Sequence, residues 1–70
     1  MIYNLDTACL DLDMLEYVSE IIETPIEEYY FRYQINGYVY NTSVFSLYTD
    51  IVEIRDSLIN TWLKNMEEIG

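Results

Sequence analysis

The chain has 70 residues and a formal net charge of −10, with 13 acidic residues, three basic residues and no histidine. Its single cysteine, Cys9, excludes an intramolecular disulfide, and the lack of histidine argues against a structural zinc site. Because 51% of the residues are hydrophobic, with eight Tyr and one Pro, the composition is that of one small folded domain, residues 1–70, and not that of a disordered acidic chain.

Residues 8–23 have the apolar spacing of an amphipathic helix that follows a short extended lead. Asp6 or Thr7 can cap this helix, whose start could be as late as Asp11, and Pro25 ends it because the residue before a proline avoids the α region. The spacing of i, i+3, i+4 and i+7 is met by Leu10, Met14, Leu15, Val18, Ile21 and Ile22.

Residues 29–44 change to the two-residue period of a β-hairpin. Asn36-Gly37 tolerates positive φ at both central positions of a tight turn and lies between two aromatic, β-branched runs. A two-residue loop pairs Ile35 with Tyr38, Tyr33 with Tyr40, Phe31 with Thr42, and Tyr29 with Val44. We expect that face to pack on helices, and the opposite face to be partly exposed, with Tyr30, Arg32, Gln34, Val39, Asn41 and Ser43.

A second helix is predicted at residues 50–68. Asp50 and Glu53 have the spacing of a capping box, and a broad apolar stripe follows. A start near Ser43 is the alternative, and the sequence does not decide which tyrosines are exposed. Arg55 is expected to pair with an acid of the first helix. The predicted fold is α+β, a single small domain of order α-β-β-α in which the Asn-Gly hairpin packs against two helices.

Negative charge is concentrated in residues 1–28, which hold eight acids and no base. On the predicted helix, Asp13, Glu16, Glu20, Glu23 and Glu27 follow spacings of three and four residues and would share one face, where like charges repel. An ordinary solvated face is one interpretation. The complete absence of bases favours the other, a surface for a basic partner, to which we add Glu28 and Tyr30 because tyrosine is enriched in binding hot spots.

Catalytic and metal-binding patterns are missing from the sequence. Without histidine no Ser-His or Cys-His pair can form, and Asp6, Asp11 and Asp13 lack the spacing and glycine of a calcium loop. We therefore expect no enzyme activity, no metal site and no cofactor. Cys9 is expected to be a small core residue.

In size, acidity and tyrosine content the chain resembles small phage-encoded inhibitors of host defence, such as anti-CRISPR proteins and inhibitors of uracil-DNA glycosylase. Members of this class imitate nucleic acid with carboxylates. The resemblance implies an inhibitor that blocks DNA binding by occupying the basic groove of a nucleic-acid-binding protein, with a CRISPR nuclease as the leading candidate. It transfers no individual residue role, because it rests on bulk properties.

A second class of function stays open: an intracellular adaptor or antitoxin-like subunit that pairs with a basic protein without imitating nucleic acid. A homodimer with a structural role is a third. In each case an anionic surface disfavours direct contact with nucleic acid or anionic lipid, and no apolar run is long enough to span a membrane. One unpaired cysteine and no signal peptide predict the cytoplasm. The identity of the target and the oligomeric state are not predicted.

Overall fold

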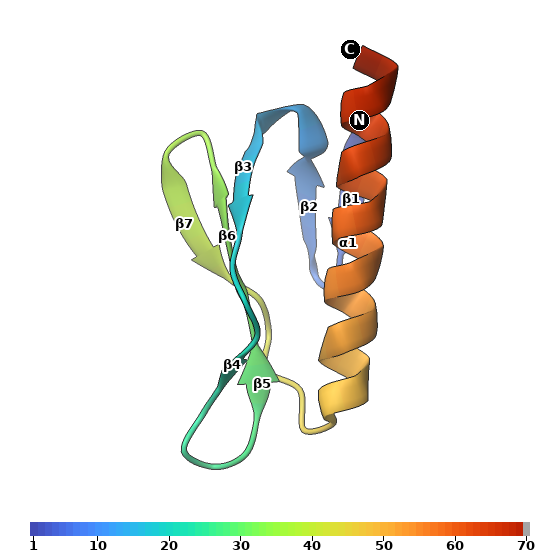
Figure 1. The fold of residues 1–70 in the computed structure, drawn as a ribbon. Coiled ribbons are helices and arrows are strands. Elements are labelled where there is room, and N and C mark those ends of the chain that lie inside the picture. The colour runs from blue at the N-terminus through green and yellow to red at the C-terminus, as the bar shows by residue number, and fades with distance from the viewer. Residues whose placement is uncertain (70) are drawn as a thin grey trace.

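The protein combines one long helix with seven short strands (Figure 1), in a computed structural model that describes residues 1–69. This confirms the α+β class, whereas the predicted α-β-β-α order is wrong because the described helix lies only at the C-terminal end. In chain order the elements are β1 (Ile2–Leu5), β2 (Ala8–Asp11), the 3-10 turn η1 (Leu12–Met14), β3 (Leu15–Val18), β4 (Ile22–Glu23), β5 (Tyr29–Tyr30), β6 (Arg32–Ile35), β7 (Tyr38–Asn41) and α1 (Tyr48–Ile69).

Strands β1 and β2 form an antiparallel hairpin with Leu5 opposite Ala8. The turn between them places Asp6 at a φ of 54°, a conformation that aspartate tolerates better than most side chains. Leu10 on β2 is buried, and so is Leu12, the first residue of η1.

The predicted helix over residues 8–23 is therefore wrong. That segment forms β2, η1, β3 and β4. Met14, counted in the helical stripe, is 52% exposed, whereas Leu12, which the stripe left out, is 1% exposed. An extended chain also moves acids three or four residues apart from about 5–6 Å to roughly 10–13 Å, which relieves the repulsion that a helix would impose.

Strands β3, β6 and β7 form an antiparallel sheet with β6 in the centre. The Asn36-Gly37 turn is confirmed, with φ of 49° and 86°, and so are the pairs Ile35–Tyr38 and Tyr33–Tyr40. The prediction for Tyr29 is off by one residue, since Tyr29 bridges Phe45 and not Val44. Of the face expected to be buried, Tyr33 is buried but Tyr38 and Tyr40 are exposed, because α1 does not cover that end of the hairpin.

The helix α1 starts at Tyr48, between the two starts considered from the sequence, and runs along the length of the molecule (Figure 1). It packs on β1, η1 and β5. Ile51 and Leu58 are fully buried, and Asn65 continues the same helical stripe as a buried polar residue. The core is formed by Leu5, Leu10, Leu12, Leu15, Phe31, Tyr33, Ile51 and Leu58.

Shortening Leu58 should unfold the domain. Leu58→Ala is expected to cost about 2–5 kcal/mol, which equals most of the stability that a core of this size supplies. The matched control is Leu63→Ala on the same helix, where Leu63 is 49% exposed and the same truncation should change stability by no more than about 0.5 kcal/mol. Thermal unfolding followed by circular dichroism compares the two; equal losses would contradict the packing of α1.

Candidate protein-interaction surface

The acids predicted to share a helical face are distributed along the molecule, because β3 and β4 carry them from one end to the other (Figure 1). Asp13 lies at the end where β1 starts and has internal partners. Its carboxylate accepts a hydrogen bond from Asn65 Nδ2 at 2.7 Å and lies 3.3 Å from the amine of Met1. The Asn65 hydrogen bond, followed by that amine, lowers the pKa of Asp13. Asp13 therefore joins η1 to α1.

Glu16 and Glu20 also make contacts within the chain. Glu16 accepts a hydrogen bond of 2.6 Å from the backbone N–H of Gly37, so it closes the β6–β7 turn against β3. Glu20 lies 3.8 Å from Arg55 Nη2, which confirms the expected pairing of Arg55 with one of these acids. The Glu20 side chain is 93% exposed, so this ion pair contributes little, and the firmer contact of Arg55 is its 2.7 Å hydrogen bond to the Ser19 carbonyl.

The remaining three predicted acids lie at the turn that joins β4 to β5: Glu23 is the last residue of β4, and Glu27 and Glu28 are in the connection. We call residues 23–28 the acidic turn. Thr24 closes it: its N–H donates to the Glu28 carbonyl at 2.8 Å, and its Oγ1 accepts from the Glu28 N–H at 3.1 Å. The Glu27 N–H donates to the Thr24 carbonyl at 3.1 Å. These bonds close the turn, which lies at the end of the molecule where α1 begins (Figure 1).

Within this turn Glu27 has a φ of 59°, in the left-handed region. Glycine is the usual residue at that position of a three-residue hairpin loop, because a side chain there costs about 1–2 kcal/mol. Glu27 has no cation within 4.0 Å among residues 1–69, so the strained position is not explained by an ion pair. The turn thus holds a carboxylate in solvent at a cost in stability.

Tyrosines stand next to the acidic turn. Desolvation raises the pKa of the Tyr29 hydroxyl, and the charges of Glu23 and Glu27 raise it further. The Tyr29 ring contacts Tyr48 edge to face, with centroids 5.2 Å apart, so β5 and the start of α1 share this end of the molecule. Tyr30 is half-buried on β5 opposite Ile22.

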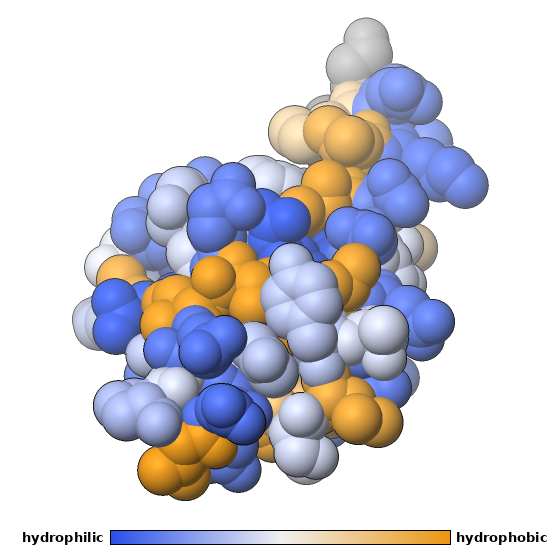
Figure 2. All heavy atoms as spheres, turned by 60° about the horizontal axis from the view of Figure 1, so that its bottom comes forward, coloured by the Kyte–Doolittle hydropathy of each residue, from blue (hydrophilic) through white to orange (hydrophobic). Residues whose placement is uncertain are grey.

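Exposed apolar side chains lie on the same end of the protein. Ile26 at the tip of the acidic turn is 75% exposed, and Val44 and Leu47, in the connection that leads to α1, are 50% and 60% exposed. Figure 2 shows this end, with blue hydrophilic side chains around several separate orange apolar ones. Acids and apolar groups are therefore interspersed here, as they are in many protein interfaces.

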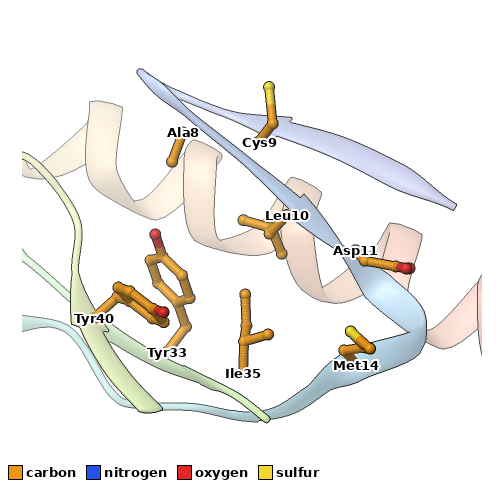
Figure 3. A pocket seen from close by; sticks show the side chains of 8 residues that line it. All are labelled: Ala8, Cys9, Leu10, Asp11, Met14, Tyr33, Ile35 and Tyr40. Atoms are coloured by element: carbon orange, nitrogen blue, oxygen red, sulfur yellow. The ribbon is translucent and has the colours of Figure 1, made fainter.

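A hollow of about 340 Å³ separates the β1–β2 hairpin from the three-stranded sheet (Figure 3). It is lined mainly by apolar side chains of β2, β6 and β7, among them Leu10, Ile35 and Tyr40. The prediction that Cys9 belongs to the core is wrong. Cys9 borders the hollow, but its side chain is exposed and points away from it in Figure 3, because Cys9 alternates with the inward-facing Leu10 along β2. Its Sγ donates to Asn4 Oδ1 at 3.1 Å.

Comparison of the chain with family models, with curated proteins and with solved structures gives no match in any of the three. Over residues 1–69, no helix combines the length and the apolar character that crossing a membrane requires. In that same range, no three His, Cys, Asp or Glu side chains are grouped so that they could hold a metal ion.

Sequence reasoning missed Ile26 and the turn that carries it. The helical interpretation explains Pro25 only as the end of a helix, although proline is also common at the second position of a turn. Thr24-Pro25-Ile26-Glu27, with β-branched and aromatic residues on both sides, fits a hairpin once the segment before it is extended.

Relieving the strain at Glu27 should stabilise the protein. We expect Glu27→Gly to raise the free energy of unfolding by up to about 1 kcal/mol, because glycine adopts positive φ without steric cost. Glu28→Gly is the matched control: it removes the same charge one residue later, where φ is not positive, and should lower stability by about 0.5–1 kcal/mol. Urea denaturation measures both; a loss at Glu27 would contradict the strained turn.

Asp13→Ala should lower the melting temperature, since buried Asn65 would lose its hydrogen-bond acceptor. The control Asp56→Ala removes an exposed carboxylate from α1 and should have little effect. Because the pKa of Asp13 is lowered from its usual 3.8, its contribution is present above pH 3.8 and is lost as the pH falls through the lower, folded value. The difference between parent and variant should thus persist from neutral pH to about pH 4 and shrink below it; a difference independent of pH would contradict the assignment.

Proposed function

We propose that this protein is an acidic inhibitor that binds the basic nucleic-acid-binding groove of a host defence nuclease in the cytoplasm and blocks DNA binding by imitating nucleic acid. A CRISPR nuclease is the target we would test first. The observation that carries the proposal is the acidic turn. It exposes Ile26 and Glu27 to solvent, holds Glu27 at a strained positive φ, and ends residues 1–28, which contain no basic residue.

Charge supports this proposal first. Grooves that bind DNA are lined by Lys and Arg that hold phosphates, and a carboxylate can take the place of a phosphate in a charge-assisted hydrogen bond with Arg. Asp13 and Glu16 have short hydrogen bonds within the chain, whereas the ion pair of Glu20 is weak and its side chain is 93% exposed. Glu20, Glu23, Glu27 and Glu28 are therefore the acids best placed to bind a partner. Complementary charge of this kind acts chiefly on the association rate and weakens as salt increases.

The exposed apolar residues at the same end of the molecule would add binding free energy to the charge contacts. Binding that depended on carboxylates alone would be lost at high salt. An apolar side chain that becomes buried in the partner adds about 1.5–3 kcal/mol of binding free energy. Ile26 lies at the tip of the acidic turn between acids, in the position of an anchor that enters a partner first. We expect Tyr30, half-buried on β5, to contribute less than Ile26.

The alternative is an adaptor or antitoxin-like subunit that binds a basic protein beside its nucleic acid. The exposed side chains of Val44 and Leu47 favour it, because an adaptor relies more on apolar contact than a mimic does. Competition distinguishes the two functions. A mimic and DNA exclude each other on the target, whereas an adaptor is bound together with DNA.

The proposal is tested with guide-loaded CRISPR nucleases and fluorescent target DNA. The protein should reduce DNA binding in proportion to its occupancy of the nuclease, and its own binding should be lost when DNA is added first. Formation of a ternary complex with DNA would support the adaptor instead. No binding to any nuclease of a broad panel would remove the CRISPR assignment.

Charge reversal locates the binding surface. Glu27→Lys with Glu28→Lys should weaken binding to the nuclease at least about tenfold, mainly through slower association at low salt. The matched control, Glu67→Lys with Glu68→Lys, makes the same charge change at the far end of α1 and should have a much smaller effect. Surface plasmon resonance at two salt concentrations measures both; equal effects would show that only net charge matters.

A further inference from the structure

Strand β7 is an open edge of the three-stranded sheet and lies on the side of the molecule away from α1 (Figure 1). Thr42 N–H donates to the Phe31 carbonyl at 3.0 Å, so alternation along the ladder directs the backbone N–H and C=O of Val39 and Asn41 outward. All four residues of β7 are exposed. The strand therefore offers two outward donors and two outward acceptors to another strand.

Nothing in β7 discourages such pairing. Natural edge strands usually carry a lysine, a proline or an inward-pointing charge that prevents contact with another edge. β7 reads Tyr38-Val39-Tyr40-Asn41 and has none of these, and Tyr38 and Val39 are 67% and 61% exposed. The edge has the β-branched and aromatic composition of a strand inside a sheet.

The hairpin that contains β7 has no acidic residue of its own, so it repels another acidic chain less than the remainder of the surface does. Residues 29–49 contain no acid in a chain whose net charge is −10, and their only charged residue is Arg32. The acid that reaches the hairpin, Glu16, is already bound to the N–H of Gly37. A second copy of the chain, repelled elsewhere by carboxylates, can approach here with the least electrostatic cost.

Tyr40 connects the edge to the hollow beside it. Its ring stacks on that of Tyr33, with centroids 5.6 Å apart, and both line the hollow together with Leu10 and Ile35 (Figure 3). A strand added next to β7 would place its own aromatic side chains on this same face. The contact therefore extends beyond four backbone hydrogen bonds onto an apolar surface.

We propose that β7 pairs antiparallel with β7 of a second copy, which joins two three-stranded sheets into one six-stranded sheet across a two-fold axis. With Val39 opposite Asn41 of the second copy, all outward backbone groups of the strand are paired, and the two Tyr40 side chains meet at the axis. The acidic turns of both copies stay free. This surface is separate from the one proposed for the target.

The dimer should respond to salt in the direction opposite to that of target binding. Two chains of charge −10 repel each other, so screening by salt should strengthen their association, whereas screening weakens contact with a basic partner. Because a four-residue strand and its flanking rings make a small interface, the dimer should dissociate within the range of about 1 µM to 1 mM.

Sedimentation velocity over that concentration range, at low and high salt, tests the proposal with the full chain. The parent should dimerise, more tightly at high salt. Val39→Pro, which removes an outward N–H, and Val39→Lys should each weaken the dimer at least about tenfold. Val44→Lys is the matched control, with the same residue type and charge change outside β7, and should dimerise like the parent. Circular dichroism checks that each variant folds.

Amide hydrogen exchange identifies the strand involved. On dimerisation the amides of Val39 and Asn41 should exchange at least about tenfold more slowly, while those of the acidic turn should not change. A parent that stays monomeric up to about 1 mM overturns the proposal. A dimer that survives both Val39 substitutions, or that leaves those two amides unprotected, overturns it as well.

Discussion

Seven carboxylates fall within residues 11–28 without one basic side chain among them, and the remainder of the fold accommodates that excess. A helix would bring these groups within about 5–6 Å of each other, whereas short strands keep them further apart. Asp13 and Glu16 then accept hydrogen bonds from distant parts of the chain, Asn65 and the N–H of Gly37, and Glu20 makes a weaker, exposed ion pair with Arg55. Some of the acids therefore gain partners within the chain, and others remain in the acidic turn.

The parts of the fold that sequence predicts well are those whose local signals agree with each other. Asn36-Gly37 lies between runs of strand-forming residues, and α1 carries a long apolar stripe. The predicted cap, Asp50, is misplaced, because α1 begins two residues earlier at Tyr48 and Asp50 lies in its first turn. Residues 8–23 fit two periods, and the helical one requires Met14 on the buried face and leaves out Leu12, the opposite of what the structure has. Helical spacing has to be weighed against charge repulsion, which in this segment argues for an extended chain.

The candidate site was predictable only in part, for a related reason. The acids of residues 23–28 could be recognised by their number, but their grouping depends on the hydrogen bonds of Thr24 and on the positive φ of Glu27. Side chains that pair across the chain, such as Asp13 with Asn65, are 52 positions apart and leave no local signal. Exposure of Ile26 likewise follows from the path of the turn and not from its residue type.

The exposed thiol of Cys9 has a practical consequence. Since it is the chain's only sulfhydryl group and its exposed side chain points away from the hollow that Cys9 borders, a maleimide fluorophore or a nitroxide spin label would attach at one defined position on β2 without entering the core. Its hydrogen bond to Asn4 fixes where the tether starts. Energy transfer or pulsed electron resonance between two labelled molecules would then report their separation directly, with the natural sequence unchanged.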